Sequence, residues 1–449
     1  MAGLKYSKVI KYKIRAVCRG PLHIGNANGG KEEVLIDSVT RMPFIQASSL
    51  AGVFRSTYAK NHSEEEVDTL FGASKMNENE NSADKKSRVV FTDGQFETQN
   101  LKIEIRPHVK IDRETGSVTS SNNSGQKFNM EYVGAGAVIN TYVYVYDNEE
   151  LSLAEEFESV LASIKAEEIS IGAKKSSGAG KLSLEYVGKK VFNLMEADDR
   201  KLWLDEESLD EKIYNDITNE LNSETKIVTA YKVVISGQTE GAILVKGIGA
   251  SSFGKDAPDA ENIKNAKDEY IVPGSSYRGA IKSQMEKIAA YIDKKSVIDK
   301  SFGFVGKKQN DSAAGNMIFN DGIIQASEQD TDVLRHRIHI DKFTGGVMHG
   351  GLFSEKNASG KIELEIDVLD KNNPKATLGL LMMALRDLSI KTINLGSGYA
   401  TGKGFIDVNS IEITSGSGNV KITFEEGNAD MTDENGIIKE ALAALKEVS

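Results

Sequence analysis

The alternation of apolar and polar residues along the chain predicts a mixture of β-strands and helices. Residue character alternates in VINTYVYVYD (138–147) and in KIELEIDVLD (361–370), which is typical of strands with one buried face. Helical spacing of apolar residues follows each of these strands, over 151–166 and over 375–389. The two stretches resemble each other, which indicates an internal repeat.

Five sequence landmarks occur twice, in the same order and with nearly the same spacing. They are FIQASSLAGVFRS (44–56) and IVPGSSYRGAIKS (271–283), LFGAS (70–74) and SFGFV (301–305), RVVFTDG (88–94) and NMIFNDG (316–322), HVKIDRETGSV (108–118) and RIHIDKFTGGV (337–347), and GAKKSSGAGKL (172–182) and GSGYATGKGF (396–405). One such match could arise by chance, whereas five in register indicate a duplication.

Both copies have the same predicted order of elements. A first strand (9–18 or 228–236) leads to a helix capped by Ser48 or Ser275, and a strand ending in FTDG or FNDG follows. An irregular insertion with IDxxTG comes next, then the alternating strand, a helix and a last strand. This β-α-β-β-α-β order predicts an α+β protein with two tandem ferredoxin-like, RRM-like domains. The expected boundaries are 1–194 for the first domain, 195–226 for an acidic helical linker, 227–415 for the second domain and 416–449 for an acidic tail.

Composition narrows the classes of protein to which the chain can belong. Of its 449 residues 39% are hydrophobic and 27% are charged, which is ordinary for a globular protein. The single cysteine, Cys18, excludes a disulfide framework and a cysteine zinc site. No uncharged apolar run approaches the ~18 residues of a membrane span, and the N-terminus lacks the apolar core of a signal peptide. We therefore expect a cytoplasmic protein without a membrane partner.

The charge is spread unevenly along the chain. A net charge of −11 argues mildly against a nucleic-acid partner when taken alone. Much of it comes from the acidic segment 195–225, whereas 102–113, 174–181, 278–287 and 335–342 are locally basic. A local basic groove therefore remains compatible with the total charge.

Three repeated motifs could contact an anion, and each also has a purely structural explanation. IDRETG and IDKFTG suit a turn, but their basic neighbours and long polar insertions favour a functional loop. Backbone N–H groups at the Ser-Ser helix starts could bind phosphate, or the serines could simply cap the helices. The glycine-rich ends could approach a phosphate chain or form flexible connections, and neither matches the GxxxxGK[ST] loop.

Together these motifs resemble the RAMP superfamily, and specifically the Cas-seven-group backbone proteins of type III CRISPR effector complexes. The resemblance rests on the Ser-Ser helix starts, Phe-Gly, Ile-Asp-[Arg/Lys]-x-Thr-Gly and the glycine-rich ends, in the same order in both copies. It covers nearly the whole chain apart from the linker and the C-terminal segment. Two such domains in one chain resemble the fused backbone subunits of type III-D-like systems.

The resemblance implies that the chain holds a guide RNA paired with a target RNA, beside other effector subunits that include a large polymerase-like one. The IDxxTG elements would form thumb hairpins that wedge between guide and target, shaped by Asp112, Thr115, Asp341 and Thr344. The remaining contacts to RNA would come from Ser48, Ser49, Arg55, His108, Lys110, Arg113, Lys174, Lys175, Lys181, Ser275, Ser276, Arg278, Lys282, Arg337, His339, Lys342 and Lys403.

The resemblance further implies cleavage of the target RNA by its own 2′-OH, with an aspartate of the loop before the Ser-Ser helix and a divalent cation, expected to be Mg²⁺. Asp256 matches that aspartate best and is the expected metal ligand, with Asp259 second. In the first copy Lys31 falls near this position, and a lysine cannot ligate Mg²⁺. Glu32, Glu33 and Asp37 lie nearby, so that cleavage by the first copy is doubtful.

Two alternatives stay open at this stage. The chain could be a non-catalytic RNA-binding subunit of the same complex, or an unrelated ferredoxin-like enzyme or RNA-binding protein. The sequence contains no HExxH pair, GxSxG elbow or GxGxxG fingerprint that would favour an unrelated enzyme.

Overall fold

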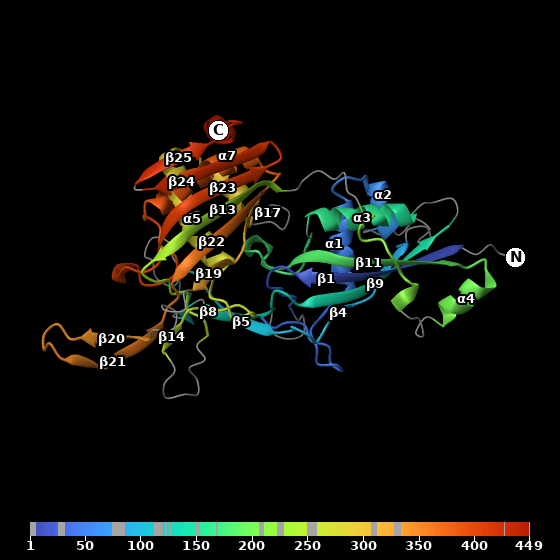
Figure 1. Cartoon of the computed structure of the whole chain (residues 1–449), viewed down its shortest axis with the longest axis horizontal. Helices are drawn as coiled ribbons and strands as arrows, with labels where there is room; N and C mark the ends of the chain where they lie inside the picture. Colours follow the sequence, from blue (N-terminus) through green and yellow to red (C-terminus); the bar gives the residue numbers. More distant parts are fainter. Residues whose placement is uncertain are drawn as a thin grey trace. The chain divides into compact units, whose positions relative to one another are not determined.

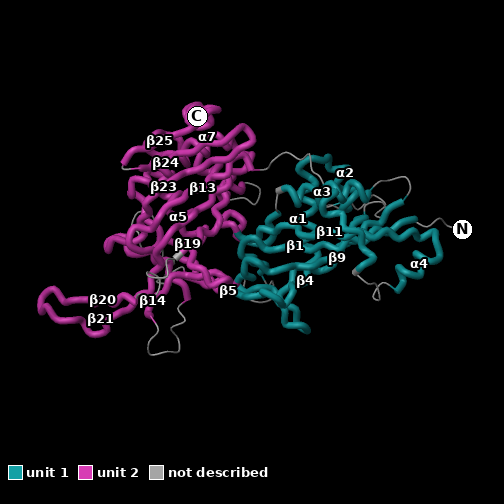
Figure 2. Tube along the Cα trace, in the orientation of Figure 1, with its two compact units in different colours: residues 1–103, 132–173, 179–226 teal, residues 104–131, 174–178, 227–449 magenta. Residues whose placement is uncertain are grey.

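The chain forms two compact units, each with its own hydrophobic core (Figures 1 and 2). The computed structural model describes residues 6–25, 32–73, 86–111, 118, 120–121, 124–125, 127–148, 153–167, 169–205, 211–221, 229–248, 258–306, 312–326, 334–425 and 427–448. Unit 1 comprises residues 1–103, 132–173 and 179–226, and unit 2 comprises 104–131, 174–178 and 227–449. Unit 2 therefore contains the second repeat together with two short segments of the first.

Unit 1 is built on an antiparallel sheet with the order β10-β11-β1-β9-β4-β2, in which β3 also pairs with β9 and β12 with β11. Counting β1, β3 with β4, β9 and β11 as the four strands of the repeat, the fourth strand lies beside the first and the third beside the second. This is the ferredoxin-like arrangement. The strands are β1 (Lys8–Cys18), β2 (Phe44–Ile45), β3 (Val89–Phe91), β4 (Gly94–Phe96), β9 (Val138–Asp147), β10 (Ile169–Ser170), β11 (Lys181–Asn193) and β12 (Asn215–Asp216).

Helices α1 (Ala47–Tyr58), α2 (Glu64–Phe71) and α3 (Leu153–Glu167) pack together in unit 1. Helix α1 buries Leu50, Phe54 and Tyr58, which recur every four residues and so lie on one face. The ring of Phe54 stacks on Phe157 of α3 at 5.9 Å between centroids and meets Phe91 of β3 edge-on at 5.0 Å. These aromatic contacts hold α1 against the sheet beside the FTDG strand.

Unit 2 has the same core of strands as unit 1, and its sheet continues beyond β23 with two further strands, β24 and β25. Its main sheet has the order β15-β19-β22-β13-β23-β24-β25, with β18 also paired to β22. Strand β13 lies between β22 and β23, as β1 lies between β9 and β11 in unit 1. The strands are β13 (Thr229–Glu240), β15 (Ile271–Val272), β18 (Met317–Phe319), β19 (Gly322–Ala326), β22 (Gly360–Leu369), β23 (Phe405–Ser415), β24 (Gly418–Glu425) and β25 (Asn428–Thr432).

The segment 416–449 is part of unit 2, which corrects its description as an acidic tail. It extends the sheet by β24 and β25 and ends in α8 (Ile437–Glu447), which packs on α7 (Pro374–Ser389). Helix α7 lies between the sheet and α8 and is apolar on nearly every side for that reason. The acidic residues of α8, Glu440 and Glu447, are exposed while Ile437, Ile438, Ala441 and Leu445 are buried, so a count of charges hid the amphipathic pattern of this helix.

The segment 195–226 also contributes to a folded unit. It contains α4 (Ala197–Leu204), a 3₁₀ turn (Glu211–Ile213) and β12, and its Ile217 and Leu221 are buried in the core of unit 1. The structure thus describes more than a helical connector over this part of the chain.

Helices α5 (Gly274–Tyr291) and α6 (Ser296–Phe302) pack in the core of unit 2. The remaining elements are β5 (Ile103–Val109), β6 (Ser120–Ser121), β7 (Ser124–Gly125), β8 (Lys127–Val133), β14 (Ala260–Glu261), β16 (Gly303–Phe304), β17 (Ala313–Ala314), β20 (Leu334–Ile340), β21 (Val347–Lys356), and the 3₁₀ turns η1 (Lys175–Ser177) and η6 (Tyr399–Thr401). The α+β class and the two ferredoxin-like repeats are confirmed. None of the described helices is both long and apolar enough to cross a membrane.

Candidate nucleic-acid interface

The IDKFTG motif forms the turn of a hairpin, β20–β21, that projects from the body of unit 2 (Figure 1). The Asp341 carboxylate accepts hydrogen bonds from the backbone N–H groups of Thr344 (2.9 Å) and Phe343 (2.7 Å). These bonds favour the charged carboxylate and lower the pKa of Asp341. The Thr344 hydroxyl accepts a hydrogen bond from the Gly346 N–H at 3.3 Å. Asp341 and Thr344 therefore fix the shape of this turn.

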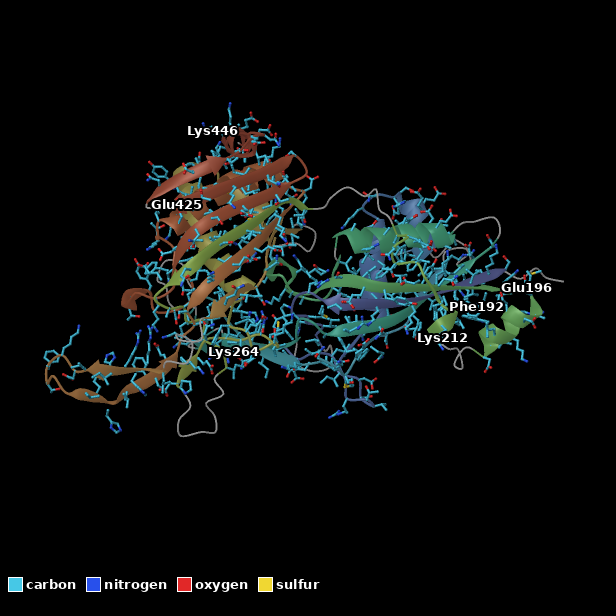
Figure 3. The ribbon with its side chains drawn as sticks, viewed as in Figure 1. Phe192, Glu196, Lys212, Lys264, Glu425 and Lys446 are labelled. Atoms are coloured by element: carbon cyan, nitrogen blue, oxygen red, sulfur yellow. The ribbon has the colours of Figure 1, made fainter. Side chains whose placement is uncertain are left out.

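The hairpin carries basic side chains and exposed apolar side chains. Side chains alternate along the regular part of β20, so Arg335 and Arg337 share one face while His336 and Ile338 share the other, and the pairing with β21 is irregular between Ile338 and Ile340. Side chains extend from the hairpin into open space in Figure 3. Exposed apolar groups concentrated on one element mark an interaction surface. They are Ile338, Ile340, Phe343 at the turn, which is 99% exposed, Val347, Met348 and Leu352.

Glu355 of β21 forms two ion pairs at the base of the hairpin. Its carboxylate pairs with Arg337 at 3.2 Å and with the buried ammonium group of Lys403. Lys403 is only 3% exposed, so this residue of the glycine-rich end holds the hairpin and is not placed on a surface for RNA. A buried ammonium group needs an anionic partner within the protein, and Glu355 is that partner for Lys403, whose contact with RNA stays a prediction.

Asp259 also lies at the base of the hairpin. Its carboxylate accepts hydrogen bonds from the backbone N–H (2.7 Å) and hydroxyl (3.1 Å) of Ser354, and these bonds lower the pKa of Asp259. The neighbouring β14 pairs with β21 in parallel. Asp259 thus ties the loop before β14 to the hairpin. Asp256, the preferred catalytic aspartate, lies outside the described residues.

The insertion of the first copy forms a second hairpin, β5–β8, most of which belongs to unit 2. The ring of His108 stacks on Phe128 at 5.2 Å, and the ammonium group of Lys174 lies 5.6 Å from the centre of the same ring. Lys110, beyond His108, is exposed. Asp112, Arg113 and Thr115, expected in its turn, lie outside the described residues.

The serine pairs do not cap their helices, which corrects the sequence-based assignment. Helix α1 begins at Ala47, whose N–H donates to the Asp93 carboxylate at 2.7 Å, and α5 begins at Gly274, whose N–H donates to Asp321 at 2.9 Å. Asp93 and Asp321 are the aspartates of FTDG and FNDG. A carboxylate from the neighbouring strand thus occupies the positive end of each helix dipole. The serines, Ser48, Ser49, Ser275 and Ser276, lie one and two positions further into the helices and are exposed or half-buried.

The basic side chains of α1 and α5 contact the residues of the Phe-Gly motifs or the helices that precede them. Arg55 pairs with Asp68 of α2 at 2.6 Å and donates to the carbonyl of Gly72. Arg278 donates to the carbonyl of Phe302 at 3.1 Å, and both Arg278 and Lys282 lie 5.3 Å from the Phe302 ring centre. These contacts join the first two helices of each repeat, so they explain the cations without RNA.

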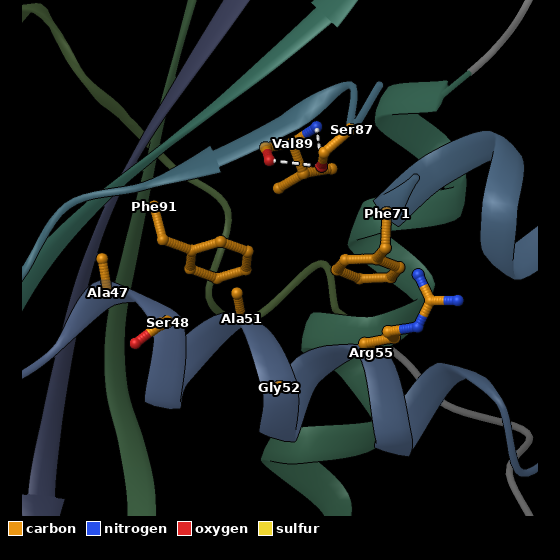
Figure 4. Close-up of a pocket in the computed structure, with 9 residues that line it drawn as sticks. All are labelled: Ala47, Ser48, Ala51, Gly52, Arg55, Phe71, Ser87, Val89 and Phe91. Carbon is orange, nitrogen blue, oxygen red and sulfur yellow. Dashed lines mark hydrogen bonds between the residues drawn. The ribbon is translucent and has the colours of Figure 1, made fainter. Parts of the chain in front are cut away.

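A cleft of about 300 Å³ opens beside the start of α1 (Figure 4). It lies between α1 and the FTDG strand, with the rings of Phe71 and Phe91 on its far side and Ser48 and Arg55 along the helix. The residues that line the cleft are Ala47, Ser48, Ala51, Gly52, Arg55, Phe71, Ser87, Val89 and Phe91. In the second repeat Arg278 stands at the sequence position of Ala51.

The glycine-rich ends pack against the exits of the first strands. A Cβ on Gly172 would lie 2.2 Å from the carbonyl oxygen of His23, and one on Gly396 would lie 2.6 Å from that of Leu244. Both glycines have positive φ angles of 81° and 82°. Close backbone packing therefore requires these glycines. Lys175 begins the turn η1 and Lys181 begins β11, beyond this packing.

The described residues do not fit a divalent cation. In the described part of the chain no three His, Cys, Asp or Glu side chains gather closely enough to hold a metal ion. One oxygen of Asp259 is committed to Ser354. In the first copy Asp37 accepts hydrogen bonds from Val39 and Thr40, which lower the pKa of Asp37 and make it a turn residue. Lys31 lies outside the described residues, and Glu32 and Glu33 are exposed.

The comparisons with known proteins agree with the duplication. The sequence pattern of the RAMP superfamily matches residues 15–183 and 240–407, once in each repeat, and the chain belongs to this superfamily. It is similar to a chain in the cryo-electron microscopy structure of the type III-B Cmr-beta complex bound to cognate target RNA, at 17% identity and a TM-score of 0.32. That match covers 42% of this chain and 62% of the other, and no curated protein sequence matches.

Proposed function

We propose that this chain is a guide-RNA-binding backbone subunit of a type III CRISPR effector complex, of a type III-D-like kind, acting in the cytoplasm. The observation that carries the proposal is the hairpin β20–β21 in a chain that belongs to the RAMP superfamily. Its partners would be the guide RNA, the complementary target RNA and other effector subunits, including a large polymerase-like one.

The basic and the apolar side chains of the hairpin suit the two kinds of surface of an RNA duplex. Arg337 and His339, together with Lys342 at the turn, offer N–H donors to phosphates. The exposed ring of Phe343 offers a plane on which a base can stack, a contact worth about 1–3 kcal/mol per base. Apolar side chains inserted between base steps unstack them. The hairpin is thus built to hold a strand by its backbone while displacing a base.

We further propose that this chain takes part in cleavage of the target RNA. We assign it to the second repeat, where Asp256 would lie in the loop that leads through Asp259 to the base of the hairpin. The attacking group would be the 2′-OH of the target itself, so the contribution of the chain is to hold it in line with the scissile bond. A divalent cation, Mg²⁺, would supply charge neutralisation. A non-catalytic subunit is the second candidate, favoured by the commitment of Asp259 to Ser354.

The test is cleavage of a labelled complementary RNA by the assembled complex with Mg²⁺ or with a chelator. Asp256→Ala is expected to abolish the cut set by the second repeat while target binding stays near normal, and Lys31→Ala is expected to remove no cut. Phe343→Ala is expected to reduce the same cut, whereas Tyr291→Ala, which removes another highly exposed ring elsewhere in unit 2, is expected to leave it unchanged.

Cutting at every site by the Asp256→Ala/Asp259→Ala double variant would contradict the catalytic assignment and leave the non-catalytic subunit as the function. Loss of a cut on changing Glu32, Glu33 or Asp37 would show that the first repeat is active.

A further inference from the structure

The sheet of unit 1 has one face against the helices and another face turned away from them. On β1 the side chains of Ile10, Tyr12 and Ile14 belong to the hydrophobic core that includes residues of α1 and α3. Side chains alternate between the faces of a strand, so the intervening Lys11 and Lys13 lie on the opposite face. This opposite side of β11, β1 and β9, strands that Figure 1 shows next to one another, is called the outer face of unit 1 below.

The outer face places aromatic rings directly opposite lysines. Lys11 pairs with Tyr144 across the ladder, and Lys13 pairs with Tyr142. The ammonium group of Lys11 lies 4.4 Å from the ring centre of Tyr142 and 5.4 Å from that of Tyr144. On the other side of β1, Lys190 of β11 stands opposite Lys11. Both tyrosines, Lys13 and Lys190 are half-buried, so rings and cations reach the surface together in the middle of this face.

The two ends of the outer face are engaged within the protein. At one end the ring of Trp203 from α4 meets Phe192 edge-on at 5.3 Å, and Phe192 is fully buried. At the other end the guanidinium group of Arg15 pairs with Glu97 at 3.0 Å and with Glu185. These two carboxylates therefore balance Arg15, and the lysines lie between the ends.

The corresponding face of unit 2 is acidic and lacks the tyrosines. Pairing with the central strands β1 and β13 aligns β9 with β22, and three carboxylates of β22 take the places of three uncharged residues of β9: Glu363 for Asn140, Glu365 for Tyr142 and Asp367 for Tyr144. Lys232, the counterpart of Lys11, pairs with Glu365 at 2.7 Å. Both repeats match the RAMP pattern, so a role that RAMP repeats share does not explain rings and cations on one of them alone.

We propose that the outer face of unit 1 binds a single strand of nucleic acid, at a site separate from the hairpin β20–β21. Sheets of this kind bind single strands by stacking bases on aromatic rings while cations hold the phosphates. Tyr142 and Tyr144 stack bases, Lys13 and Lys190 contact phosphates, and Lys11, which is 6% exposed, holds the two rings in place. The inference rests on the outer face of unit 1 and not on the proposed function.

The chemistry of the site also predicts what it selects. Every base has a face that can stack, so binding is expected to be independent of sequence. A duplex is expected to bind more weakly, because its bases are already stacked on one another. RNA and DNA single strands offer the same bases and phosphates, and the tighter of the two identifies the natural ligand.

Fluorescence anisotropy with the full chain and a labelled oligoadenylate of about 12 nucleotides, as RNA and as DNA, tests the site. Tyr142→Thr, which keeps a residue that favours strands, is expected to weaken binding about tenfold through the loss of one stacked base. Tyr142→Phe keeps the ring and is expected to bind like the wild type. Lys190→Gln is expected to make the slope of log K against log salt shallower by about 0.7, the value of one phosphate contact.

Matched controls separate this site from general effects of ring or charge. Tyr291→Thr removes an exposed ring elsewhere, and Lys421→Gln removes a lysine of β24 on the corresponding face of unit 2. Neither is expected to change the affinity or the salt slope. The guide RNA that the proposed function predicts is expected to copurify with Tyr142→Thr as with the wild type, so the two proposals fail independently.

Equal affinity of the wild type and a folded Tyr142→Thr variant for both strands would overturn the proposal. Photo-cross-links of the bound strand are expected on the tyrosines of β9, and cross-links confined to the hairpin β20–β21 would equally overturn it. Lys190→Gln and the cross-links decide the matter even where Tyr142→Thr unfolds unit 1, because neither removes a ring from the sheet.

Discussion

Single residues in this protein carry roles that their local sequence does not reveal. Asp93 and Asp321 follow strands in the sequence, yet each holds the first N–H of a helix that begins 46 or 47 residues earlier. The sequence showed the aspartates as part of a repeated FxDG motif, but no rule of local capping connects them to those helices. Lys403 was equally hidden, because its partner Glu355 lies on a hairpin strand far away in sequence.

Two helical glycines of unit 2, Gly379 and Gly279, have very different surroundings that the sequence does not reveal. Gly379 of α7 faces α8, and a Cβ there would lie 2.5 Å from the carbonyl oxygen of Ala441. Gly279 of α5 is also in a helix, but a Cβ there would meet nothing within 4 Å. The same substitution should therefore have opposite signs at these two positions.

We expect Gly379→Ala to destabilise unit 2 by about 1–3 kcal/mol, because the clash with Ala441 forces α7 and α8 apart. Gly279→Ala is expected to stabilise it by about 0.5–1 kcal/mol, the ordinary preference of a helix for alanine. Denaturant unfolding of the full chain measures both. Equal stabilisation by the two variants would contradict the packing of α8 on α7.

At the scale of elements, the strands and helices of the two cores follow from alternation and periodicity. Strand β9 alternates between buried and half-buried positions as its sequence predicts, and β22 does so over most of its length. The strands and helix of 416–449 were missed because their many charges lie on exposed positions. The hairpin β20–β21 was expected from the resemblance alone, since a two-stranded ribbon with apolar residues exposed does not follow the pattern of a buried sheet.

The turn of this hairpin should depend on pH through Asp341. Its pKa is lowered in the folded turn, so its contribution is fully present above the unfolded pKa and is lost as the pH falls through the folded pKa. By NMR, the Asp341 carboxyl group and the amides of Phe343 and Thr344 are expected to titrate together, at a midpoint below the ordinary aspartate value. In Asp341→Asn these amide shifts should not move over that pH range, and movement there would assign the titration to another group.

At the scale of the whole molecule, the duplication was the strongest signal in the sequence, and the RAMP match to both halves agrees with it. The sequence could not place the segments 104–131 and 174–178 in unit 2, because docking of one repeat's insertion onto the other depends on contacts such as Arg106 with Asp321. Nor could the sequence show that Arg55, Arg278 and Lys403, which were assigned to RNA, have partners within the protein.

The central claim is that the chain holds a guide RNA. The most direct measurement is to isolate the tagged chain from its native cells, extract the bound nucleic acid and sequence it. We predict that small RNAs of uniform length copurify with the wild-type chain and with Asp256→Ala alike, and that these RNAs share one end, which derives from the CRISPR repeat. Recovery of no RNA, or of cellular RNA with random lengths and ends, would contradict the account.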